Sequence, residues 1–142
     1  MTSLAERLTL GPGVKVAGVI GLRDGKTLHD GVITNGAGYQ VVDNAATLKP
    51  DVEPFNRIGN IGLTHVEGHM AALIRERALA TGEQVHATAV LTKRPCPGPM
   101  GCHENLHLML PFGSTLTVYV REPNGALRQV KTYVGTGLGV KP

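Results

Sequence analysis

Hydrophobic side chains recur along this chain at two spacings, one typical of strands and one typical of helices. The strand pattern covers four segments in which valine, isoleucine and leucine run together or alternate with other residues: 14–22, 85–91, 116–120 and 127–134. A shorter segment of the same kind covers 39–42. These segments predict the strands of a sheet.

Two glycine-containing dipeptides predict tight turns between strands. Asp24-Gly25 follows the first apolar segment, and Asn124-Gly125 separates the last two. Glycine accepts the positive φ angle that such turns require, and Asn or Asp commonly precedes it. We therefore expect a return strand at 26–34 and a hairpin built from the last two segments.

The helical spacing first occurs just after residue 64. The predicted buried stripe consists of Val66, Met70, Leu73 and Ile74. Thr64 is a suitable N-cap, and Glu67 stands three residues later, which is the capping-box arrangement. Gly82 is suited to end the helix, because glycine accepts the left-handed conformation found there.

A second, shorter helix is predicted after a Pro- and Gly-rich loop at 92–101. Its apolar positions are Cys102, Leu106, Met109 and Leu110. Pro111 then stops the helix, because proline disfavours helical backbone before it and lacks an amide hydrogen.

The remaining segments lack a periodic pattern. Residues 43–63 are expected to form a long irregular connection, and such loops are often functional in compact domains. Residues 1–12 and 135–142 are expected to be mobile tails, although Leu4 and Leu8 could share one face of a short helix. The whole pattern predicts one α/β domain spanning 1–142, a mixed sheet with helices packed on it.

The amino-acid composition excludes several classes of protein. The 142 residues are 42% hydrophobic and 18% charged, which is too apolar for a disordered chain, and no apolar run is long enough to span a membrane. No basic segment followed by an apolar run marks a signal peptide. The net charge is +3, and the excess of lysine and arginine lies after residue 67, so this half is the better candidate to meet phosphate.

Four residues suggest metal chemistry: His65, Glu67, Cys96 and Cys102. A catalytic zinc site takes three protein ligands and leaves one position for water, and His65 with the two cysteines can supply the three. Glu67, near a helix start, could carry protons for that water. A histidine, a carboxylate two residues on and two later cysteines form the signature of zinc-dependent nucleobase deaminases.

Each of these four residues could also have a purely structural role. Glu67 could serve only as a cap, His65 could be an ordinary surface or core histidine, and the cysteines could form a disulfide or a pair of buried apolar residues. His65 and His69 are four apart, as in metalloprotease helices, but the glutamate between them is displaced by one position. His103 and His107 are also four apart, and we expect them on a solvated helix face.

Three groups of residues resemble one known family. They are residues 65–72 (HVEGHMAA), the pairs Pro95-Cys96 and Gly101-Cys102, and residues 110–118 (LPFGSTLTV). These motifs look like the bacterial deaminase toxins grouped with double-stranded DNA deaminase toxin A, and they cover about half of the chain. Five residues separate the two cysteines here, where the common deaminase pattern has two.

This resemblance implies a cytidine-deaminase fold, a three-layer α/β/α arrangement with a five-stranded mixed sheet flanked by helices. It implies conversion of cytosine to uracil in DNA, Zn²⁺ held by His65, Cys96 and Cys102, and Glu67 as the proton carrier. It also implies a toxin domain of a larger secreted effector, which acts in the cytoplasm of a competing bacterium and meets an immunity protein at home.

Substrate contacts are predicted from residue type and from the loops that would border the site. Phe55, Tyr39 and Phe112 could stack on bases, and Asn60, Lys93 and Arg94 lie in bordering loops. We expect single-stranded DNA rather than the duplex. The alternatives are a deaminase of RNA or free nucleosides, and a non-catalytic module that holds a structural zinc or a disulfide.

Overall fold

A five-stranded sheet forms the centre of the molecule in a computed structural model, which describes residues 4, 5, 8, 16–35, 42–53, 55, 61–98 and 101–141. Its strands are β1 (Ala17–Leu22), β2 (Ile33–Thr34), β3 (His86–Leu91), β4 (Thr115–Arg121) and β5 (Leu127–Val134). They lie in the order β2-β1-β3-β4-β5, with β3 and β4 parallel and the other pairs antiparallel. The predicted five-stranded mixed sheet is confirmed.

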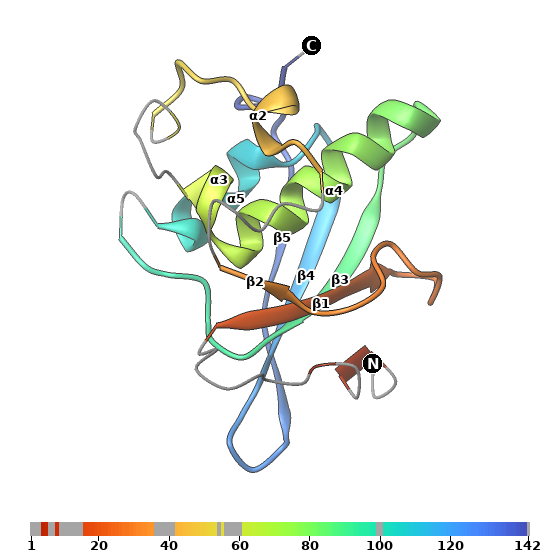
Figure 1. Ribbon diagram of the computed structural model, residues 1–142, viewed down its shortest axis with the longest axis vertical. Helices are drawn as coiled ribbons and strands as arrows, with labels where there is room; N and C mark the ends of the chain where they lie inside the picture. Colours follow the sequence, from red (N-terminus) through yellow and green to blue (C-terminus); the bar gives the residue numbers. More distant parts are fainter. Residues whose placement is uncertain are drawn as a thin grey trace.

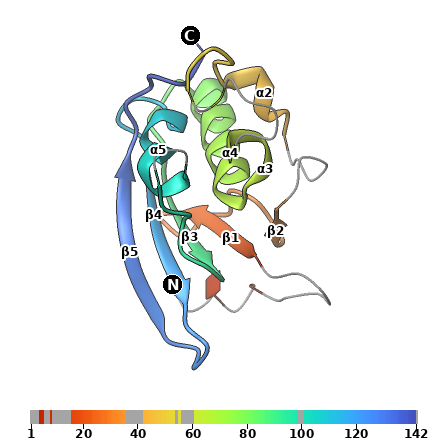
Figure 2. The ribbon, with the colours of Figure 1, turned by 90° about the vertical axis from the view of Figure 1, so that its left-hand side faces the viewer.

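Four helices lie on one face of this sheet (Figures 1 and 2). They are α2 (Asn44–Thr47), α3 (Ile61–Thr64), α4 (Val66–Thr81) and α5 (Cys102–Met109). The residues of the predicted stripe in α4 are buried, but so is every other residue from Val66 to Arg75, so the first half of this helix is buried on all sides. Met70 packs so closely on β1 that a Cβ atom at Gly18 would lie 2.5 Å from Met70 Cε. Gly82 ends α4 in the left-handed conformation, as predicted.

The opposite face of the sheet buries a smaller apolar cluster. Ala17, Val19 and Val90 point to this face, and Leu8 covers them together with Leu4. Leu4 and Ala5 are helical and Leu8 is buried, which corrects the predicted mobile tail for these three residues, and the other residues of 1–12 lie outside the described part of the chain. The α/β fold with helices flanking a mixed sheet therefore agrees with the expectation from sequence.

The first hairpin agrees with the sequence prediction at its turn but not in its return strand. Gly25 has a φ angle of 91°, and the amide of Leu22 donates to the Lys26 carbonyl at 2.8 Å. The predicted return strand at 26–34 is mostly wrong, because only Ile33 and Thr34 pair as a strand. Before them, Thr27 forms only an isolated bridge with Gly21, and Gly31, with a φ angle of 104°, interrupts the extended backbone.

The expectation of an irregular connection at 43–63 is corrected by two short helices, α2 and α3. Asp43 caps α2, since its side chain accepts a hydrogen bond from the amide of Ala45. Four-residue helices are too short to show a 3.6-residue period, so the hydrophobic pattern could not reveal them. The strand predicted at 39–42 lies outside the described residues except for Val42, which is not in a strand.

The C-terminal segment is fixed by hydrogen bonds, which corrects the predicted mobile tail at 135–142 for all but its last residue. The amide of Gly137 donates to the carbonyl of Leu110, which follows α5, and the amide of Gly139 donates to the carbonyl of Leu108 within α5. The amide of Lys141 donates to the Thr47 carbonyl at 3.0 Å. The segment therefore joins the C-terminal end of α5 to α2.

Among the described helices, none combines the length and the apolar character that crossing a membrane would require.

Candidate metal centre

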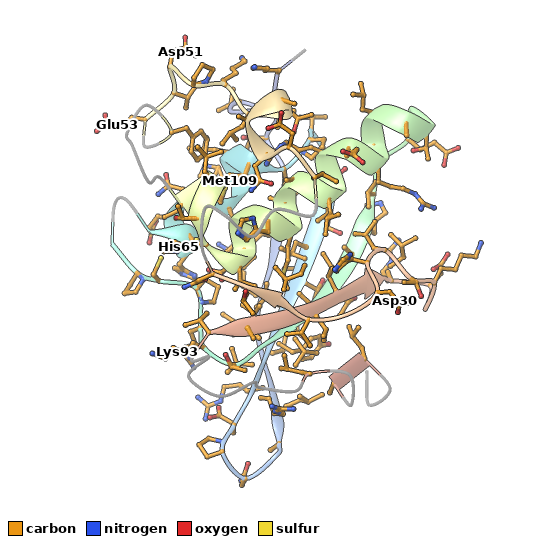
Figure 3. The ribbon with its side chains drawn as sticks, in the orientation of Figure 1. Asp30, Asp51, Glu53, His65, Lys93 and Met109 are labelled. Atoms are coloured by element: carbon orange, nitrogen blue, oxygen red, sulfur yellow. The ribbon has the colours of Figure 1, made fainter. Side chains whose placement is uncertain are left out.

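Two helix starts meet at one end of the helical layer, and each carries one possible metal ligand. His65 is the N-cap of α4, and Cys102 is the first residue of α5. The Nδ1 atom of His65 lies 3.4 Å from the Sγ atom of Cys102. Figure 3 shows His65 where α4 begins. The sequence predicts His65 and Cys102 as ligands of one zinc ion, and the structure brings them together.

Cys96 completes the group. Its Sγ atom also lies 3.4 Å from His65 Nδ1, and the ligand atoms of all three residues lie within 4.8 Å of one another. Both cysteines are free thiols, so the disulfide considered from sequence is absent from the structure.

The spacing of these atoms fits a tetrahedral zinc ion. Zinc bonds of about 2.3 Å to sulfur and about 2.0 Å to nitrogen, at the tetrahedral angle, separate the sulfur and nitrogen atoms by about 3.5 Å. The two observed separations of 3.4 Å are close to this value. One imidazole and two thiolates also bind zinc in preference to magnesium and calcium, which are harder ions and favour oxygen ligands.

The start of α4 differs from the predicted capping box. Thr64 is the last residue of α3, so α4 begins one residue later than expected, with His65 as N-cap and no side-chain capping bond. Asn35 supplies the missing acceptor instead, because its Oδ1 accepts the amide of Val66 at 3.0 Å. The capping role predicted for Glu67 is therefore wrong.

Glu67 is buried beside the three candidate ligands and is not on the surface. Its side chain is 3% exposed and is hydrogen-bonded to the side chain of Cys102. Burial raises the pKa of the Glu67 carboxyl, while the bond to Cys102 and the nearby His65 lower it to a smaller extent. A carboxyl group so placed can hold or release a proton beside the metal ligands.

The loop between the cysteines folds back tightly on the first turn of α5. The amide of Cys102 donates to Cys96 Sγ at 3.1 Å, and the amide of His103 donates to the Cys96 carbonyl at 3.1 Å. A Cβ atom at Gly101 would overlap the carbonyl oxygens of Cys96 and Pro97, so this close approach requires glycine. The long spacing between the cysteines thus still lets both sulfur atoms converge.

The two thiols differ in their readiness to ionise. Hydrogen bonds from the side chain and the amide of Cys102 help to lower the pKa of Cys96 to about 5. The pKa of Cys102 is raised, first because its thiol donates to Cys96 and then because it is buried. Of the two, Cys96 therefore loses its proton first, and a bound cation favours the thiolate of both.

Gly101→Ala should weaken zinc binding by about 5- to 150-fold. Forcing a methyl group against backbone carbonyls costs about 1–3 kcal/mol, and here the strain falls on the loop that holds Cys96. Competition with a chromophoric chelator measures the change. Gly21→Ala is the matched control, because its added Cβ would make only ordinary contacts. Wild-type zinc affinity in Gly101→Ala would contradict this account of the loop.

The alternative pairing of His65 with His69 does not occur. His69 is buried one turn further along α4, and its Nδ1 atom lies 3.0 Å from Nδ2 of Asn44 in α2. Among the described residues, the only group that could hold a metal ion is that of His65, Cys96 and Cys102. His69 thus belongs to the packing between α2 and α4.

The aromatic residues predicted to contact substrate differ in their exposure to solvent. Phe55 is 3% exposed within the main apolar core, so the prediction that it stacks on bases is corrected. Phe112 is 78% exposed and lies beyond the C-terminal end of α5, whereas Cys102 is the first residue of that helix, and its predicted contact with substrate stays a prediction. Because Phe55 is packed in the core, its ring has no exposed face on which a base could stack.

Lys93 and Arg94 are exposed in the segment between β3 and Cys96 (Figure 3 labels Lys93). Their predicted contact with phosphate is compatible with this position and stays a prediction. Asn60 and Tyr39 lie outside the described residues.

Several residues that hold the site or its helices in place were not predicted from the sequence. Asn35 caps α4, Tyr133 bonds to the neighbour of Cys102, and Arg75 crosslinks three helices. Each contacts residues distant in sequence, so no local pattern marks it. The one available signal was an arginine in the apolar stretch of α4, where a charged residue interrupts a buried face.

Comparison with family models places the chain among known proteins. A model described as SCP1.201-like deaminase matches residues 3–137. The chain belongs to the SCP1.201-like deaminase family. Searches among curated proteins and among solved structures found no match. The match covers the whole sheet and all the helices described above, including the metal-ligand group of this deaminase domain.

Proposed function

We propose that this chain is a zinc-dependent deaminase that converts cytosine to uracil in DNA. The observation that carries the proposal is the convergence of His65, Cys96 and Cys102 beside the buried Glu67, in a chain of a deaminase family. One histidine, two cysteines and a glutamate that is not a metal ligand are the groups that zinc-dependent nucleobase deaminases use.

In this proposal His65 binds zinc through Nδ1, and Cys96 and Cys102 bind it as thiolates. Bound zinc supplies a Lewis acid that makes water nucleophilic at neutral pH. The two thiolates offset the charge of the ion. The amides at the start of α5 further stabilise the thiolate of Cys102, since the N-terminal end of a helix favours negative charge.

Glu67 carries the protons of the reaction. Its carboxylate takes a proton from the attacking water and delivers it to the ring nitrogen next to the carbon under attack. It then transfers the second proton of that water to the amino group, which leaves as ammonia. Burial beside Cys102 keeps the carboxyl group at the reacting centre and away from bulk water.

The number of ligands supports a catalytic rather than a structural zinc. Structural zinc sites are usually closed by four protein ligands, whereas catalytic sites have three. In the part of the chain that the structure describes, the group has three members. A zinc ion held by these three residues would keep a fourth position for water or substrate.

Single-stranded DNA is the substrate that we favour. A base in a duplex must be flipped out at a cost of a few kcal/mol, whereas a single strand can be bound with its bases already separated. The exposed Lys93 and Arg94 next to Cys96 support contact with a phosphate backbone. We further propose that the domain acts as the toxin of a bacterial effector, in the cytoplasm of a target cell, and that an immunity protein neutralises it.

The test is deamination by the purified, zinc-loaded protein. Cytosine-containing oligonucleotides, single- and double-stranded, are incubated with the protein, treated with uracil excision enzyme and examined for strand cleavage. We expect cleavage of the single strand first. Parallel reactions with RNA and free nucleosides separate the alternative substrates, and absence of uracil in every DNA sample would refute the proposal.

A further inference from the structure

A polar groove lies between α5 and β5. It has a volume of about 400 Å³, and its walls come from His103, Glu104 and His107 of α5 and from Lys131, Thr132 and Tyr133 of β5. Figure 2 shows α5 next to β5. His103 directly follows Cys102, so the groove borders the first turn of α5, the turn that carries one of the candidate metal ligands.

Two of the residues that line this groove, His103 and Tyr133, hold each other in place through a contact between their rings. Tyr133 is buried, and its hydroxyl group lies 2.8 Å from Nδ1 of His103. The two rings pack edge to face, with centroids 5.8 Å apart and an angle of 85° between their planes. This contact attaches the first turn of α5 to β5, so the groove has a preformed shape.

The walls present groups that suit a nucleotide. The ammonium group of Lys131 lies 5.3 Å from the centre of the Tyr133 ring, on an exposed side chain that can turn towards a phosphate. The imidazole rings of His103 and His107 are partly exposed and offer flat faces on which a base can stack. The volume falls within the range of about 300–1,000 Å³ typical of small-molecule sites.

We propose that this groove binds the nucleotide adjacent to the target cytosine, with its phosphate on Lys131 and its base against the imidazole rings. The inference rests on the proposed function, because it assumes a nucleic-acid strand whose target base reaches the metal centre. Glu104 lies on the α5 side of the groove, and its negative charge repels the phosphate. Lys131 and Glu104 thus affect the binding of the strand in opposite directions.

The experiment compares three single variants of the zinc-loaded protein. Lys131→Ala removes the attraction, Glu104→Gln removes the repulsion, and Lys141→Ala is the control, an exposed lysine outside the groove. Binding of a fluorescent single-stranded oligonucleotide is measured by anisotropy at several salt concentrations, and KM and kcat are measured in the deamination assay.

We expect Lys131→Ala to raise the Kd and KM about three- to fivefold with kcat unchanged, and to reduce the salt dependence of binding by about one phosphate contact. Glu104→Gln should lower both constants by a similar factor. Thermal stability and zinc content should stay at wild-type values in both, which excludes an effect through folding.

Equal Kd values for Lys131→Ala and Lys141→Ala would overturn the proposed groove, as would changes of the same sign in Lys131→Ala and Glu104→Gln. Because the binding measurement does not depend on turnover, it judges the groove alone. Absence of uracil with the wild-type protein counts against the proposed function instead.

Discussion

Glu67→Gln is expected to lower the rate of deamination by about 10²- to 10⁴-fold while zinc stays bound. Glutamine has nearly the same shape as glutamate and can keep a hydrogen bond to Cys102, but it cannot take up a proton from water. The metal ligands His65, Cys96 and Cys102 are unchanged. The rate is measured with a single-stranded oligonucleotide, and zinc is measured in the same preparation.

Glu76→Gln serves as the matched control, since Glu76 is exposed on the same helix, α4. It should deaminate at the wild-type rate. If Glu67→Gln instead lost zinc and unfolded, the carboxyl group would be a structural part of α4 and not the proton carrier. An unchanged rate in Glu67→Gln would assign proton transfer to another group.

Arg75→Met should lower the free energy of unfolding by about 3 kcal/mol, because two buried carbonyls and one part-buried hydroxyl would lose their donor. Arg75 is 2% exposed, and its guanidinium group donates to Thr47 Oγ1 at 2.9 Å, to the Met109 carbonyl at 3.0 Å and to the Asn44 carbonyl at 3.1 Å. Figure 3 labels Met109, at the end of α5. Burial lowers the pKa of this guanidinium to about 10.

Two effects of opposite sign decide the size of that change. Methionine removes the cost of keeping a charge away from water, which stabilises the variant. It also leaves three acceptors without their donor, and each buried unpaired acceptor costs about 1–3 kcal/mol. The second effect is larger because methionine fills the space but offers no hydrogen-bond donor.

Thermal unfolding in saturating zinc should show a decrease in Tm of roughly 10 °C for Arg75→Met, given about 2–4 °C per kcal/mol for a chain of this size. Arg77→Met is the control, because Arg77 is exposed two positions further along α4. If Arg75→Met were as stable as the wild-type protein, the three hydrogen bonds would contribute no net stability.

The elements predicted correctly from sequence are those with strong local signals. The last hairpin has β5 at the predicted residues 127–134, because Asn124-Gly125 sets its turn and the alternation of β4 marks the strand before it. Helices α4 and α5 are long enough to show their apolar spacing. His65, Cys96 and Cys102 were grouped from residue type and order alone, and the structure places them together.

The features missed from sequence depend on contacts between distant segments. Thr64 has the residue type of an N-cap, yet it completes α3, and Asn35 from another part of the chain supplies the cap. Phe55 is aromatic and lies in a loop, yet it packs in the core. Residue type alone cannot distinguish a stacking aromatic from a core aromatic, because both require the same apolar ring.

The C-terminal segment also has a consequence for the order of folding during synthesis. The amide of Lys49 donates to the Gly139 carbonyl, Leu48 pairs with Val140, and the amide of Lys141 donates to Thr47. Residues 47–49, at the end of α2, can therefore form these backbone hydrogen bonds only after residues 139–141 have left the ribosome. While it is being translated, the polypeptide would contain the metal ligands without the segment that joins α2 to α5.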